Sequence, residues 1–293
     1  MPGSTSLSLL PRAAACVVAA VLVLSTLEEP EAGRRGRGGA APRTAGGPRE
    51  GLELIGQIGG RAGSVALDAE ARRAFLAVGP RVLVLDLSDP ADPRRVGRSD
   101  VLDEVVSALA LDGDRLYVGG RYGGLWVLDV AGAAVSSLVW RGAVGAPVTD
   151  LATADGHLLV AAGESLTWFD ASAPDAPRLV AAHDLPDPPA AVDVDGDTAV
   201  VVFGRRPSGR LRVLSLEAAP GIRVRSELAL TGTPVDTALE GRKAFVLETS
   251  AFRVVDLGDG TQPRIVGSST SLEWHATPPA NRPTDSIFWA WRK

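Results

Sequence analysis

The feature that most constrains this chain of 293 residues is a segment that recurs every 41 to 45 residues. Each copy contains an apolar stretch that ends in an acidic or hydroxyl residue. The five copies read VLVLDLSDP, GLWVLDV, SLTWFDASAP, RLRVLSLEAAP and AFRVVDLGDG, and their aligned residues are Asp86, Asp129, Asp170, Ser215 and Asp256. Such a period indicates a repeat protein, in which each copy forms one unit that packs against its neighbours.

Each copy predicts four short β-strands. An Asp-Gly or Glu-Gly pair follows the first apolar strand of four copies, and glycine favours the positive φ of a tight hairpin. These pairs begin at Asp112, Asp155, Asp195 and Glu240. In the second copy the predicted strands span residues 106–111, 115–119, 124–130 and 137–144. Four-stranded units with this period are typical of a β-propeller, so we predict an all-β fold of four-stranded blades.

Three copies continue into a second motif, with a proline seven residues after the aspartate. The segments are VLVLDLSDPADPRRVG, FDASAPDAPRLVA and VVDLGDGTQPRIVG, with Pro93, Pro177 and Pro263. They resemble the LVIVD repeat, a propeller module of bacterial and archaeal exported or surface proteins. The resemblance covers residues 52–268 and implies the fold, but it implies no single activity. The second copy lacks both prolines and its LYVGGRYGGLWVLDV resembles a kelch blade, which is the alternative.

The number of blades depends on the two ends of the repeat region. The segment LELIGQI, which begins at Leu52, resembles the last strand of a blade and is predicted to complete the final blade. Residues 271–293 contain two predicted strands, 272–276 and 286–291, but lack the acidic motif. Six blades with an incomplete last one is the first interpretation. Five blades with a trailing segment is the alternative.

The first fifty residues predict an exported protein. Residues 12–27 form an apolar run, expected to be helical, that is shorter than the ~20 residues of a comfortable membrane span. Residues 1–28 are therefore interpreted as a signal peptide, with an uncleaved signal anchor as the alternative. Residues 29–50 are rich in Gly, Ala, Pro and Arg and predict a disordered linker. Beyond it we assign residues 51–270 to the propeller and 271–293 to a partial blade or tail.

The charge distribution argues against nucleic acid as the partner. The chain carries 30 Lys and Arg against 35 Asp and Glu. Six Arg and four Glu lie in the first fifty residues, which leaves 24 minus 31, or −7, for the remainder. An acidic body repels a phosphate backbone. Membrane contact is expected only through the N-terminal segment, and the expected location is the periplasm, the cell surface or the medium.

Candidate ligand-binding residues lie in loops on one face of the ring. In an antiparallel meander, the links between second and third strands share a face with the links between blades. The candidates on this face are Asp103, Glu104, Arg121, Tyr122, His183, Asp184, Arg205 and Arg206. The wider set adds Arg61, Glu164, Asp187 and Glu248.

No motif in the sequence predicts a catalytic residue, a metal ligand or a cofactor. A Gly-x-Ser-x-Gly elbow is absent, and the three histidines fall in separate repeats. Asp193, Asp195 and Asp197 fit a hairpin turn better than a calcium loop, because no glutamate follows at the twelfth position. His157 is expected to be an exposed hairpin residue. The recurring aspartates are expected to cap turns, and the tryptophans at 126, 140 and 168 to pack between blades.

The sequence therefore favours a noncatalytic exported propeller, a scaffold that binds a protein or glycan at the cell surface or in the periplasm. The alternative is a propeller hydrolase or lyase that acts on a small ester, lactone or saccharide. That alternative requires two carboxylates, or a carboxylate and His183, to converge at the mouth of the channel.

Overall fold

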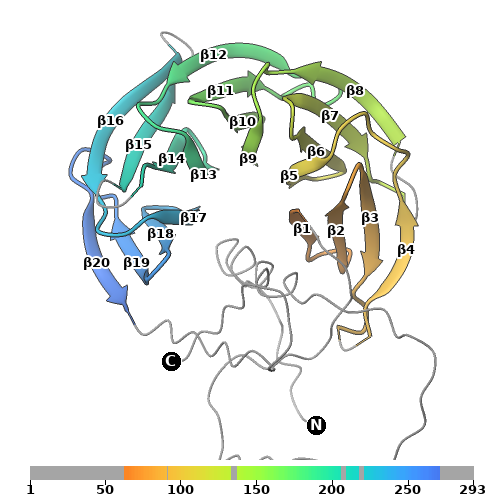
Figure 1. The fold of residues 1–293 in the computed structure, drawn as a ribbon, viewed down its shortest axis with the longest axis horizontal. Coiled ribbons are helices and arrows are strands. Elements are labelled where there is room, and N and C mark those ends of the chain that lie inside the picture. The colour runs from red at the N-terminus through yellow and green to blue at the C-terminus, as the bar shows by residue number, and fades with distance from the viewer. Residues whose placement is uncertain (1–62, 91, 133–136, 206–208, 218–220, 271–293) are drawn as a thin grey trace, which may run out of the picture.

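The chain folds as a β-propeller, seen here in a computed structural model that describes residues 63–90, 92–132, 137–205, 209–217 and 221–270. Five four-stranded antiparallel sheets follow one another in chain order around a central axis (Figure 1). Within the described residues no helix is long and apolar enough to cross a membrane. The predicted N-terminal helix, the segment LELIGQI and the two strands predicted after residue 271 lie outside those residues.

Each blade is a meander of four consecutive strands. Blade 1 contains β1 (Val65–Asp68), β2 (Arg73–Val78), β3 (Arg81–Asp86) and β4 (Arg94–Arg98). Blade 2 contains β5 (Val106–Asp112), β6 (Arg115–Gly120), β7 (Gly124–Asp129) and β8 (Ser137–Ala143). Blade 3 contains β9 (Val148–Ala154), β10 (His157–Ala162), β11 (Ser165–Asp170) and β12 (Arg178–Asp184). Blade 4 contains β13 (Pro189–Asp195), β14 (Thr198–Phe203), β15 (Arg210–Glu217) and β16 (Gly221–Ala229). Blade 5 contains β17 (Pro234–Glu240), β18 (Lys243–Glu248), β19 (Ala251–Asp256) and β20 (Arg264–Ser269).

The hairpins form where the sequence predicts them. The four strands of blade 2 begin at the predicted residues and end within one residue of the predicted ends. In blade 3, Asp155 and Gly156 have φ of 51° and 80°, the two positive values of a type I′ hairpin turn. Asp and Gly tolerate this conformation better than other residues, so the Asp-Gly pair fixes the register of β9 on β10.

The core consists of separate apolar layers between neighbouring blades. Phe75 packs with Trp126 between blades 1 and 2, and Tyr117 with Phe169 between blades 2 and 3. Trp168 lies in the layer between blades 3 and 4, which also contains Phe203. Because the second and third strands of a blade are covered on both faces, they read as continuous apolar runs. This explains why stretches such as TAVVVF in β14 show little alternation of apolar and polar residues.

The recurring aspartates cap the turn that follows each third strand, as predicted. The side-chain oxygen Oδ1 of Asp86, Asp129 and Asp170 accepts the backbone N–H two residues later, at 2.8 to 3.0 Å. Asp256 accepts the N–H of Gly258 in the same way at 2.9 Å. Blade 4 departs from this pattern, because the Ser215 hydroxyl donates instead to the Glu217 carboxylate at 3.0 Å.

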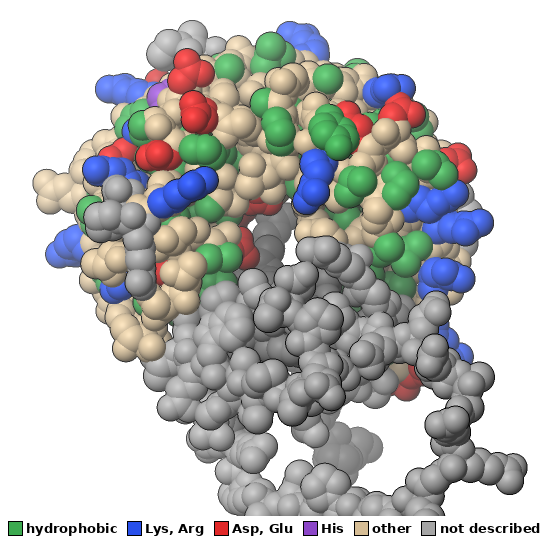
Figure 2. All heavy atoms as spheres, viewed as in Figure 1, with side chains coloured by type: hydrophobic (Ala, Val, Ile, Leu, Met, Phe, Trp, Pro, Cys, Tyr) green, Lys and Arg blue, Asp and Glu red, His purple; other side chains and the backbone are tan. Residues whose placement is uncertain are grey.

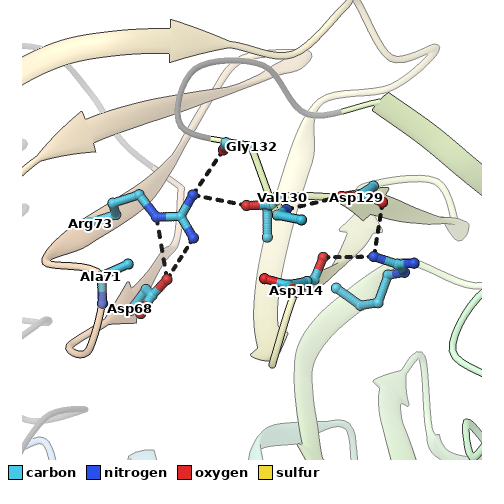
Figure 3. Close-up of polar contacts among 9 residues, drawn as sticks. Asp68, Ala71, Arg73, Asp114, Asp129, Val130 and Gly132 are labelled. Atoms are coloured by element: carbon cyan, nitrogen blue, oxygen red, sulfur yellow. Dashed lines mark hydrogen bonds and ion pairs between the residues drawn. The ribbon is translucent and has the colours of Figure 1, made fainter.

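Side chains at the start of the second strands tie neighbouring blades together. The guanidinium of Arg73 pairs with Asp68 in its own blade at 2.7 Å and donates to the carbonyl oxygens of Val130 and Gly132 in blade 2 at 2.8 and 2.9 Å (Figure 3). Arg115, at the same position of blade 2, pairs with Asp175 of blade 3. The ring is therefore held by polar contacts at its rim as well as by its apolar layers.

Candidate functional site

A groove opens between blades 2 and 3 on the face that carries the links between blades. Its volume is about 470 Å³. One wall comes from the link between β8 and β9, with Val144 and Ala146, and the other from β11 and β12, with Phe169 and Leu179. Leu179 is 64% exposed, which is unusual for a leucine. An open apolar groove of this size is a common form of binding site.

Two carboxylates give the groove a negative charge. Glu164 and Asp184 both lie on its lining, and both side chains are exposed to solvent. The hydroxyl of Ser165 also reaches the lining, where it donates to the carbonyl oxygen of His183 at 3.3 Å. The groove can therefore accept an apolar group next to a cation or a hydrogen-bond donor. Of these lining residues, the sequence predicted Asp184 and, in its wider set, Glu164.

Four predicted ligand-face residues lie close together in blade 2. Asp103 pairs with Arg141 at 2.6 Å, with both side chains more than half exposed. Glu104 accepts the backbone N–H of Tyr122 at 2.7 Å and of Gly124 at 3.4 Å. Arg121 is exposed, and the Tyr122 side chain is 75% exposed. The two carboxylates lie in the link between blades 1 and 2 and hold a side chain and a turn of blade 2.

His183 lies on β12 and contacts blade 4. Its Nε2 is 3.2 Å from Nη1 of Arg212, and Arg212 in turn pairs with Glu227 at 2.8 Å. Burial and the Arg212 charge lower the pKa of His183 below its usual value. The neutral ring then accepts an N–H from the guanidinium, and its nearest charged partner is a cation. The contact of His183 with Arg212 connects blades 3 and 4, and Arg212 is held within blade 4 by its stack on Phe203, at 5.0 Å.

The remaining predicted residues are scattered around the ring. Arg205 and Asp187 are exposed. Glu248 is fully buried and pairs with Arg253 at 3.0 Å, so it stabilises blade 5 and does not face a ligand. Arg61 and Arg206 lie outside the described residues.

A cluster of three partly buried carboxylates near the channel was not predicted as a site. Asp150, Asp193 and Asp236 lie on the innermost strands β9, β13 and β17, and acidic side chains border the central opening (Figure 2). Burial raises the pKa of Asp150 to about 8, with a further contribution from the charges of Asp236 and Asp193. Burial likewise raises the pKa of Asp193 to about 6 and that of Asp236 above its usual value. The one sequence pattern that could have indicated these residues is an aspartate within the otherwise apolar first strand of a blade, as in PVTDLATA.

These carboxylates bind backbone N–H groups of the propeller itself. Asp150 accepts the N–H of Leu151 in its own strand and that of Val192 in blade 4, both at 2.9 Å. Asp193 accepts the N–H of Val194 and that of Leu239 in blade 5, at 2.8 and 2.6 Å. Each therefore links two innermost strands. This use of their oxygens favours a structural role over acid–base chemistry.

The three aspartates of the VDVDGD segment turn to three different partners. Asp193 contacts blade 5 as described, and Asp195 accepts the N–H of Gly241 at 2.6 Å. Asp197 is 3.3 Å from Nε2 of His157. Within the part of the chain that the structure describes, no group of three His, Cys, Asp or Glu side chains is placed to hold a metal ion. The segment is a hairpin, as predicted.

The prediction for His157 was wrong. Its side chain is only 18% exposed, because Nδ1 accepts the indole N–H of Trp168 at 3.1 Å while Nε2 faces Asp197 of blade 4. The residue follows the hairpin turn directly, which made it look exposed in the sequence. The ring instead lies between Trp168 of its own blade and Asp197 of blade 4, which cover it from two sides.

Solved structures confirm the class of fold. The chain is similar to a functionally unknown protein from Desulfotomaculum acetoxidans, with a TM-score of 0.60, 11% identity and 74% of each chain covered. It is similar to the β-propeller domain of Cps50 (Swd1) from Myceliophteria thermophila, with a TM-score of 0.56, 13% identity and 71% of each chain covered. A protein from Lactobacillus plantarum gives a TM-score of 0.56 at 14% identity, with 73% of this chain and 67% of that one covered. No protein-family model and no curated protein matches the sequence. These likenesses show the β-propeller fold, of which the described residues form five blades, and they do not identify a function.

Proposed function

We propose that this chain is an exported, noncatalytic β-propeller that binds a segment of a partner protein in the groove between blades 2 and 3. The observation that carries the proposal is the groove itself, which combines apolar walls with the carboxylates of Glu164 and Asp184. A peptide segment that presents an apolar side chain beside a lysine or arginine complements both features. A glycan is the less favoured ligand, since the walls offer only Phe169 as an aromatic surface.

Two further observations support a scaffold over an enzyme. The hydrolase or lyase alternative depends on carboxylates or His183 at the channel mouth. Asp103 and Glu104 are bound to groups of blade 2, and His183 is bound to Arg212.

Export is supported by the sequence, through the apolar run of residues 12–27 and the linker of residues 29–50. Such a tether would hold the propeller near a membrane or wall while leaving the groove open to a partner.

The experiment is a peptide selection with groove variants. The full chain is immobilised, and random twelve-residue peptides displayed on phage are selected against it. We expect peptides that place an apolar residue next to Lys or Arg, because these satisfy the walls and the carboxylates. The binding of each selected peptide is then measured by fluorescence anisotropy.

Two variants and one control locate the binding. Ala182→Trp places a bulky ring into the groove from the exposed strand β12, and it is expected to weaken binding at least about tenfold, which is ~1.4 kcal/mol. Ser268→Trp puts the same ring at the matching position of the outer strand of blade 5 and should leave binding unchanged. The pair Glu164→Gln and Asp184→Asn should remove the preference for basic peptides. Equal binding by Ala182→Trp and the unmodified chain would refute the groove as the site.

A further inference from the structure

Polar side chains on the innermost strands connect each blade to the next one along the chain. The hydroxyl of Ser64, beside β1, accepts the N–H of Leu109 in blade 2 at 3.1 Å. The hydroxyl of Ser107 in blade 2 donates to the carbonyl oxygen of Val148 in blade 3 at 2.7 Å. Asp150 and Asp193 make the next two connections, to blades 4 and 5, as described above. All four junctions between described blades are thus linked near the axis.

Asp236 of blade 5 occupies the same structural position as Asp150 of blade 3. Asp150 pairs across its sheet with Ala161, and Asp236 pairs with Leu247, which lies at the same point of the second strand. Asp150 of blade 3 points toward the next blade along the chain, blade 4. Because Asp236 occupies the equivalent position, it points to the side of blade 5 that faces away from blade 4. Among the described residues its carboxylate accepts one hydrogen bond, from the N–H of Thr237 in its own strand at 2.8 Å. Asp150 and Asp193 each accept a second N–H from the next blade, but within the described residues no such second N–H is recorded for Asp236.

The face of blade 5 around Asp236 is apolar and incompletely covered. Phe245 and Leu247 of β18 lie on this face with Phe252 and Val254 of β19, and all four are only partly buried. The rings of Phe245 and Phe252 stack with their centroids 6.3 Å apart. On the opposite face of the same strands, Val246 and Val255 are fully buried against blade 4. The outward face therefore resembles one half of a layer between blades.

Blade 1 presents a matching apolar face. Its side toward blade 2 contains Phe75 and Val82, both fully buried. Its other side carries an apolar cluster in which most members are only partly buried. The cluster comprises Ala74, Leu76, Leu85, Val65, Leu67, Val78, Leu83 and Leu87. Blades 1 and 5 are the two ends of the arc of described strands, and no described strand lies in the sector between them (Figure 1).

We infer that this sector is the docking surface for the chain's own flanking segments, 51–62 and 271–293, which add a sixth, closing blade. These segments directly precede β1 and directly follow β20, so both reach the sector without a long connection. They also supply the apolar residues that the two faces require, including Leu52, Ile55, Trp274, Phe288 and Trp289. In the inferred blade, residues 272–276 would supply the innermost strand and a second backbone N–H for Asp236. Residues 52–58 would supply the outermost strand. The inference is independent of the groove and its ligand.

The test is hydrogen exchange measured by mass spectrometry on the full chain at a concentration where light scattering shows a monomer. We expect the amides of residues 52–58 and 272–276 to exchange at least about 100-fold more slowly than those of the linker at 34–50. Deleting residues 271–293 should remove this protection from 52–58, although those residues are still present. The deletion should also accelerate exchange in β1 while leaving β9 and β10 unchanged.

A pair of substitutions separates the proposed surface from general destabilisation. Phe252→Asp places a charge on the outward face of blade 5, and Val266→Asp places the same charge on the 56% exposed Val266 of its outer strand. Only Phe252→Asp should release the protection of 52–58 and 272–276. Linker-like exchange of both segments in the unmodified chain would overturn the inference. Protection that appears only at concentrations where the chain dimerises would also overturn it, by identifying a second copy as the occupant.

Discussion

The carboxylate of Asp150 makes the stability of this propeller depend on pH in an unusual direction. Burial raises its pKa from 3.8 to about 8 in the folded chain. Between those values the folded chain holds a proton that the unfolded chain has released. The free energy of unfolding therefore falls as the pH rises through this window, by about 1.4 kcal/mol per pH unit. Below pH 4 and above pH 8 this contribution is constant.

The size of the effect follows from the width of the window. About four pH units correspond to a loss of about 5 kcal/mol from pH 4 to pH 9, an upper value for one carboxyl. Asp150→Asn removes the titrating group and keeps the shape of the side chain. The amide oxygen can accept only one of the two N–H groups, from Leu151 or Val192, that Asp150 now binds. We therefore expect the variant to be about 1 to 3 kcal/mol less stable than the unmodified chain at pH 5 and more stable at pH 9.

The assay is urea unfolding of the full chain at pH 5, 6, 7, 8 and 9, followed by tryptophan fluorescence. Groups that do not interact with Asp150 change the profile of both proteins equally, including His183, whose lowered pKa makes stability fall as the pH drops through and below 6.5. Asp193 and Asp236 are the exceptions, because their charges act on Asp150. The quantity to compare is therefore the difference between the two free energies of unfolding at each pH. Asp155→Asn is the matched control, because Asp155 lies in an exposed hairpin at a positive φ that Asn also accepts. Parallel profiles for the unmodified chain and Asp150→Asn would refute the reasoning.

Two further substitutions test the buried contacts. The side chain of Glu248 is fully buried and pairs with the guanidinium of Arg253. Glu248→Ala removes this carboxylate and leaves the guanidinium unpaired, so we expect the free energy of unfolding by urea to fall by about 3 kcal/mol. An unchanged urea midpoint for Glu248→Ala would contradict this prediction. Gly119→Ala places a methyl group 2.4 Å from Cγ1 of Val148 in the next blade and should cost about 1 to 3 kcal/mol. In the double variant with Val148→Ala the two costs should be less than additive, and full additivity in thermal unfolding would show that the contact is not responsible.

The sequence was sufficient for the local structure because hairpins and turn caps depend on short-range chemistry. The Asp-Gly pairs set the turns between first and second strands, and Asp86 and its counterparts cap the turns after the third strands. Both effects act over two or three residues, so a single copy of the repeat displays them. The period of the repeat then predicted four-stranded blades, since a blade cannot bury its two faces alone.

The sequence was a poorer guide to polar residues that contact another blade. His157 follows a hairpin turn and reads as exposed, yet Trp168 and Asp197 bury most of its ring. Asp150 reads as a break in an apolar strand, yet it accepts the N–H of Val192, 42 residues further along the chain. No pattern within one copy reveals Asp197 or Val192 as a partner, because each belongs to the next repeat.

The candidate site, too, could be predicted from the sequence only in part. Strand order alone decides which loops share an end of the ring, so the sequence could place Glu164 and Asp184 on one face, and both line the groove. Their role in binding stays a prediction. The groove beside them could not be predicted, since its walls come from two blades and its shape depends on how they pack. The sequence by itself thus determined the turns, the strands and the repeat, which are set by neighbouring residues. Only the tertiary structure decided which charges are paired, which carboxylates are buried and where a ligand can bind, because those properties arise between blades.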